Sequence, residues 1–179
     1  MRYSIRKLTF MAILLAIALI IFVIEAQIPL PVPIPGVKLG LSNAVTLFAL
    51  FFSTRTPDTN RSPVYLNNFD VFLILVCRII LGLFFTGRLI TFAFSLCGGL
   101  VALVAMIISK RFVNTNQIWV CGAIGAVFHN IAQIGVAIFL TGTPAIAAYL
   151  PILLITAIIT GVLTGLIAQL TLSRIQLTL

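Results

Sequence analysis

Long apolar runs constrain the fold of this chain more than any other feature. The run from Leu8 to Ile24 contains no charged residue, and similar runs recur as far as Leu172. A helix that crosses the hydrocarbon core of a bilayer needs about 20 mostly apolar residues. The runs do not alternate apolar with polar residues, as the strands of a membrane barrel do. The sequence therefore predicts an all-α, polytopic integral membrane protein.

Composition supports this class of protein. Of the 179 residues, 61% are hydrophobic and 8% are charged, whereas about a quarter of a soluble domain is charged. The net charge of +8 does not indicate nucleic acid as a partner, because the basic residues form no continuous stripe or amphipathic face. The lipid bilayer is the environment that the composition predicts.

Six apolar segments are separated by polar or turn-forming sequences. The predicted helices cover residues 8–27, 39–52, 69–86, 89–109, 118–140 and 145–172. The stretch "STRTPDTNRSPVYLNN" predicts a polar loop, and "TGR" and "TGTP" predict short turns. We expect residues 1–179 to form a single domain, a bundle of six transmembrane helices.

The basic residues predict the orientation of this bundle. With a cytoplasmic N-terminus, only Lys38 and Arg88 lie in outer loops. The cytoplasmic segments then hold Arg2, Arg6, Lys7, Arg55, Arg61, Lys110, Arg111 and Arg174. Because an excess of Lys and Arg marks the cytoplasmic side, both termini are predicted to be cytoplasmic.

The first outer loop, residues 28–38, has the sequence "IPLPVPIPGVK". Alternate prolines fix φ and favour an extended, stiff backbone. The loop is also apolar, so it can lie across the mouth of the bundle. We interpret it as a lid over a site beside Glu25 and Lys38; the alternative is a re-entrant connector that shortens the second helix.

Ionisable and amide side chains also occur inside the predicted spans. An ionisable group in the bilayer core costs at least about 2.5–3.5 kcal/mol, so each one requires an explanation. Arg78 and His129 lie at a similar depth, about 14 and 16 Å into their helices at 1.5 Å per residue. Such groups either contact a ligand or join helices through hydrogen bonds. The candidate ligand-binding residues are Glu25, Lys38, Ser42, Asn43, Arg78, Arg88, His129, Asn130 and Gln133.

These candidates favour a small ligand with an anionic group, because the basic residues among them outnumber the single carboxylate. We identify no catalytic residues, cofactor or metal site. The cysteines form no C-x-x-C pair, and no histidine has the spacing of a metal site.

Helix 8–27 has two distinct faces. Ala12 and Ala16 form a small-x-x-x-small pair, which permits the close approach of another helix in a membrane. Glu25 lies roughly 180° around the helix from Ala16, at about 100° per residue. We therefore expect the helix to present a packing face at one end and a polar group at the other.

Several motifs in order resemble a known family. They are "IPGVKLGLSNAVTLFAL", "RIILGLFFTG", "SLCGGLVALVAM" and "GAIGAVFHNIAQIGVA". With the basic start and the alanine pair, they resemble the Gx transporter family, also labelled heptaprenyl diphosphate synthase component I. This group is similar to the substrate-binding S components of energy-coupling-factor (ECF) vitamin transporters.

The resemblance implies a bacterial plasma-membrane protein that captures a vitamin-like or precursor molecule from outside. It would work with an ECF-type coupling subunit and cytoplasmic ATPases. Ala12 and Ala16 would be the docking site for the coupling subunit, and residues 28–38 would close over the ligand.

The family's other label implies an alternative, a membrane subunit associated with a polyprenyl diphosphate synthase. Prenyl transfer needs clustered carboxylates that share Mg²⁺ with a diphosphate. The only aspartates are Asp58 and Asp70, which are far apart in the sequence. The sequence therefore predicts a protein without its own catalytic or ATPase activity, and in this alternative a non-catalytic partner.

Overall fold

The computed structural model describes residues 4–28, 38–55 and 66–178. Its elements are α1 (Ile5–Glu25), α2 (Asn43–Arg55), α3 (Asn68–Thr86), α4 (Leu89–Ser109), α5 (Ile118–Thr141), the 3₁₀ helix η1 (Pro144–Tyr149) and α6 (Leu150–Thr178). No strand occurs in these ranges. The predicted all-α class is therefore confirmed.

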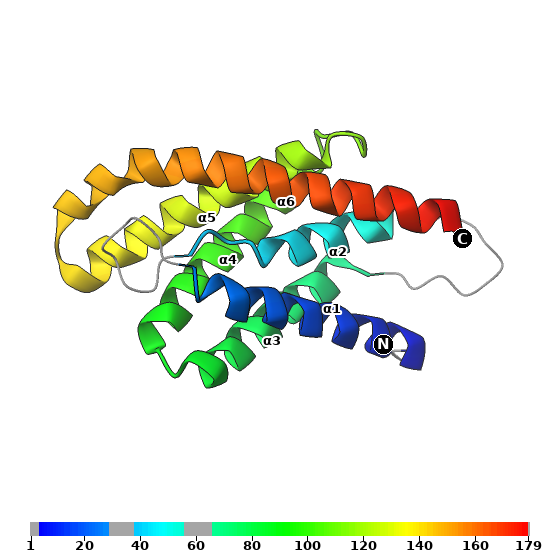
Figure 1. Ribbon diagram of the computed structural model, residues 1–179, viewed down its shortest axis with the longest axis horizontal. Coiled ribbons are helices and arrows are strands. Elements are labelled where there is room, and N and C mark those ends of the chain that lie inside the picture. The colour runs from blue at the N-terminus through cyan, green and yellow to red at the C-terminus, as the bar shows by residue number, and fades with distance from the viewer. Residues whose placement is uncertain (1–3, 29–37, 56–65, 179) are drawn as a thin grey trace.

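The helices form an elongated bundle (Figure 1), in which the short α2 lies between α1 and α6. Helix α5 packs against α4 and α6, and α1 packs against α3. The N- and C-terminal ends of the chain lie at the same end of the bundle. Glu25, at the far end of α1, therefore lies at the opposite end.

Five stretches of helix are long and apolar enough to cross a membrane: α1, α3, α4, α5 and the continuous stretch Pro144–Ile175. The remaining predicted span, residues 39–52, corresponds to α2, which has only 13 residues. At 1.5 Å per residue it is about 20 Å long, less than the hydrocarbon core of about 30 Å. It is also largely buried, because Val45 to Phe51 all lie inside the bundle. We therefore describe α2 as a central helix rather than as a sixth span of full length.

Helix α1 has the two faces that the sequence predicts. A buried stripe runs along it through Met11, Leu14, Ala18, Phe22 and Glu25, whereas Ala12 and Ala16 are exposed. These spacings of three and four residues put the stripe on one side of the helix. The alanine pair therefore lies uncovered on the side away from Glu25.

Helices α5 and α6 approach closely through glycines. A Cβ atom at Gly122 would lie 2.3 Å from the carbonyl oxygen of Gly161, and one at Gly165 would lie 2.5 Å from the Cα of Trp119. Only hydrogen fits at these positions, which is how small residues bring membrane helices together. Gly161 and Gly165 therefore mark the tight packing of α6 against α5.

The start of α2 differs from the predicted start at residue 39. Gly40 has φ of 80°, a left-handed conformation that interrupts a helix. Residues Lys38–Ser42 therefore form a separate segment before α2, and Asn43 is the first helical residue. Helix α6 also differs from its predicted range, because η1 precedes it and it continues to Thr178.

An ion pair joins α1 and α3 near the terminal end of the bundle. Lys7 Nζ lies 2.6 Å from Asp70 Oδ2, and the same oxygen accepts the backbone N–H of Asn67 at 2.6 Å. Asp70 is therefore engaged in helix capping and in this pair. The other aspartate, Asp58, lies outside the described residues.

Candidate functional site

The segment before α2 and the first residue of that helix, together Lys38–Asn43, are held by side chains from other helices. Ser42 Oγ accepts a hydrogen bond from Arg78 Nη1 of α3. The backbone N–H of Lys38 donates to Gln133 Oε1 of α5 at 3.3 Å. Helices far apart in the sequence therefore meet at this segment. Together they form a buried polar cluster, which comprises Glu25, Lys38, Ser42, Asn43, Arg78, His129, Asn130 and Gln133.

Glu25 holds the turn of this segment. One carboxylate oxygen, Oε1, accepts the backbone N–H groups of Gly40 at 2.5 Å and Leu41 at 3.2 Å. The left-handed conformation of Gly40 turns both N–H groups toward the carboxylate, as in the anion-binding concavities formed by successive N–H groups. Its other oxygen, Oε2, is buried and has no hydrogen-bond partner.

His129 lies between two glycines. A Cβ atom at Gly98 of α4 would be 2.8 Å from His129 Cε1, and one at Gly40 would be 3.2 Å from His129 Cδ2. The imidazole ring therefore occupies space that any side chain at Gly98 would need. This contact explains why the apolar helix α4 has a glycine at that position.

The hydrogen bonds of His129 determine which nitrogen carries the proton of a neutral ring. Because Gln133 Oε1 accepts from Lys38, its Nε2 is the atom 3.0 Å from His129 Nε2, and it donates to the ring. His129 Nδ1 then carries the proton. The Asn43 amide lies 3.2 Å from Nδ1, and the backbone of Gly98 also forms a hydrogen bond with the ring.

Asn130 is completely buried beside His129 but forms a different contact. Its Nδ2 donates to Ala126 O of the same helix at 3.1 Å, and its Oδ1 has no hydrogen-bond partner. It therefore belongs to the buried cluster by position and not by hydrogen bonds to the other candidates.

Two cations and one carboxylate are buried in this cluster. The Lys38 Nζ lies 3.1 Å from the centre of the Phe22 ring, a cation–π contact. Neither Lys38 nor Arg78 forms an ion pair with Glu25, and Lys38 Nζ and Arg78 Nε have no hydrogen-bond partner. Burial lowers the pKa of Lys38 against the opposing attraction of Glu25, and with the repulsion of Arg78 the result is a pKa of about 8. The cluster therefore contains buried hydrogen-bond donors that have no acceptor.

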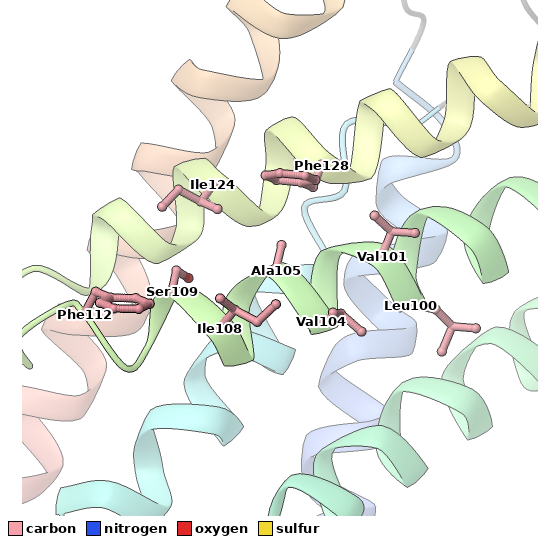
Figure 2. Close-up of a pocket in the computed structure, with 9 residues that line it drawn as sticks. All are labelled: Leu100, Val101, Val104, Ala105, Ile108, Ser109, Phe112, Ile124 and Phe128. Carbon is pink, nitrogen blue, oxygen red and sulfur yellow. The ribbon is translucent and has the colours of Figure 1, made fainter.

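A crevice lined by Gly40, Asn43 and residues of α2, α4, α5 and α6 has a volume of about 10 Å³, room for one water molecule at most. A much larger hollow of about 550 Å³ lies between α4 and α5 (Figure 2), lined by Val104, Ile108, Phe128 and other apolar side chains. Its lining contains none of the candidate ligand-binding residues, so this hollow and the polar cluster lie at different places in the bundle.

One predicted site residue lies apart. Arg88 is exposed at the N-terminus of α4 and takes part in none of the hydrogen bonds of the cluster. The predicted lid falls mainly on residues 29–37, outside the described residues. The sequence did not indicate Phe22, Gly40 or Gly98; the "GG" pair inside an apolar helix was the available signal for Gly98.

The described residues contain no group of three or more His, Cys, Asp or Glu that could hold a metal ion. The cluster offers hydrogen-bond donors, a carboxylate and one imidazole. This arrangement suits the binding of a polar group.

The family described as heptaprenyl diphosphate synthase component I matches residues 14–171, which include every residue of the cluster. No curated protein and no solved structure matches the chain.

Proposed function

Because the chain belongs to the heptaprenyl diphosphate synthase component I family, the Gx transporter family, we propose that it is the substrate-binding subunit of an uptake system in the bacterial plasma membrane. Its substrate would be a small vitamin-like or precursor molecule. An ECF-type coupling subunit and cytoplasmic ATPases would supply the energy for transport.

The observation that carries this proposal is the buried cluster where the end of α1 remote from the termini meets the middle of α3 and α5. Glu25, Arg78 and His129 come from three helices and meet at one short segment. Buried polar atoms are normally satisfied, yet Glu25, Lys38 and Arg78 each keep one without a partner. Groups that only joined the helices would satisfy each other, so the free atoms favour a ligand site.

The uncovered face of α1 supports docking of a second membrane subunit. Ala12 and Ala16 are exposed, and their methyl groups would let a partner helix approach closely. Ile13 and Ile17 beside them line a groove of about 310 Å³ between α1, α2 and α6. This face is therefore our candidate docking site for the coupling subunit.

The family description suggests another partner, a polyprenyl diphosphate synthase. In that role the chain would be non-catalytic, since Asp70 is already engaged by Lys7. The buried cluster does not favour this role, because it lies at the opposite end of α1 from Lys7 and Asp70.

Co-purification tests the proposal. The native chain, extracted in detergent from its own membranes, is compared with the double variant Ala12→Leu/Ala16→Leu. Leucine keeps the face apolar but prevents close helix approach. We expect a coupling membrane protein and ATPases to co-purify with the native chain and to be lost with the double variant.

Gly135→Leu provides the matched control, because Gly135 is exposed on α5 and a Cβ atom there meets nothing within 4 Å. This variant should retain the partners. Recovery of a prenyl synthase alone, or of the ATPases with the double variant, would contradict the proposal.

A further inference from the structure

We propose that the substrate carries a single carboxylate group, and that Arg78 and Lys38 bind it. This inference rests on the proposed function and assigns the substrate class of the same site. It follows from the charges and from the hydrogen-bond donors of the buried cluster.

The charges favour one negative charge on the ligand. Lys38 and Arg78 are each positive and Glu25 is negative, which leaves one positive charge uncompensated. Lys38 is 7% exposed, Arg78 2% and Glu25 4%, and a buried charge without a partner is unfavourable. A carboxylate restores neutrality, whereas a phosphate monoester with nearly two charges would reverse the sign.

The free donors fit the same group. Arg78 Nε and Lys38 Nζ have no partner. Two donors, from α3 and from the segment before α2, are thus free, and an ionised carboxylate is acceptor-only.

Other titratable groups around Lys38 do not remove the preference for a ligand with one negative charge. Glu25 faces it from α1, Arg78 from α3 and His129 from α5. Glu25 carries one negative charge, and its oxygen Oε1 is also engaged by the backbone of Gly40 and Leu41. A single carboxylate cannot neutralise two cations, so a second anion is favoured.

Binding would move the segment before α2. The crevice at Gly40 and Asn43 has a volume of about 10 Å³ and is too small for a carboxylate, since even one water needs about this volume. The segment before Asn43 is held by side-chain hydrogen bonds and not by a helix. It is therefore the part of the site that can shift at least cost.

A series of three phenyl compounds tests the proposal. Benzoate, benzamide and phenyl phosphate share one ring and carry one, no and nearly two negative charges. Each is added at matched ionic strength to the purified protein in detergent, and the melting temperature is measured. We expect benzoate to raise it by several degrees, phenyl phosphate by less, and benzamide not at all.

Single substitutions show which residues produce the shift in melting temperature with benzoate. Lys38→Met and Arg78→Gln should each remove most of the benzoate shift, and Lys38→Arg should retain it. Arg111→Met, which removes an exposed cation between α4 and α5, should leave it unchanged.

An equal shift with benzamide, a larger one with phenyl phosphate, no shift with any compound, or an unchanged benzoate shift in Lys38→Met would each overturn the carboxylate assignment. The proposed uptake role is judged separately by the co-purification test, so the two can fail independently.

Discussion

Glu25 at the end of α1 accepts the backbone N–H of Gly40 at 2.5 Å, which fixes the segment before α2 to the first helix. The same oxygen accepts the N–H of Leu41. A side chain thus supplies the acceptor for two backbone N–H groups that have no helical partner, because they lie before the first residue of α2.

Glu25→Ala should destabilise the protein by about 2 kcal/mol or more. The substitution leaves two N–H groups without their acceptor, at about 1–3 kcal/mol for each buried one, and it also isolates the Lys38 and Arg78 charges. Glu25→Gln keeps an acceptor oxygen and should cost less. Unfolding in detergent at neutral pH measures both, and equal stability of Glu25→Ala and the native protein would contradict the role of this contact.

The stability of the ligand-free protein should rise with pH above about 8. The pKa of Lys38 falls from 10.5 when exposed to about 8 in the fold. Between these values the unfolded chain binds the proton and the folded chain does not, so raising the pH favours folding. Below pH 8 both states are protonated, and the full cost of burying the charge is present.

Lys38→Met should remove this rise and stabilise the ligand-free protein at neutral pH by about 1–2 kcal/mol, which is less than the full shift because the cation–π contact with Phe22 is lost together with the charge. Melting curves from neutral to alkaline pH compare the two proteins. Lower stability of Lys38→Met at neutral pH would show that the lysine is structural rather than kept for a ligand.

Gly98→Ala should disturb the cluster without changing any polar group. Its methyl would lie 2.8 Å from His129 Cε1, so the ring has to shift and the contacts with Asn43 and Gln133 weaken. Overpacking of this kind costs about 1–3 kcal/mol. Gly135→Ala is the matched control, with open space around the new methyl; if both variants unfold alike and bind benzoate alike, the ring is not confined by α4.

Gly122→Ala should separate α5 from α6. Its Cβ atom would lie 2.3 Å from a backbone oxygen of Gly161, and a backbone cannot rotate away as a side chain can. We expect a loss of about 3 kcal/mol, measured as a lower midpoint of unfolding in detergent. A variant as stable as the native protein would mean that these helices can part freely.

The apolar runs predicted the helices well because each long helix in a bilayer needs an uninterrupted run. The bounds of α4 were predicted without error, and those of α3 and α5 to within one residue. Glu25, Arg78 and His129 were recognisable because polar residues inside apolar runs require partners.

The contacts of the site were less predictable. Which helix faces which depends on packing, so the pairing of His129 with Gly98 or of Lys38 with Phe22 left no pattern within either segment. Arg88 has the same charge as Arg78, but the turn after α3 leaves it exposed. The start of α2 was misplaced because the left-handed Gly40 lies within an otherwise apolar stretch.

The most direct test of the account is to identify the small molecules that remain bound to the protein purified from its own cells. Mass spectrometry of the denatured native protein is compared with that of Arg78→Gln, prepared in parallel. We predict one carboxylate-bearing compound in stoichiometric amount with the native chain and its loss from the variant. A native protein that carries no small molecule, or the same compound at the same level in Arg78→Gln, would contradict the claim that this cluster captures a substrate.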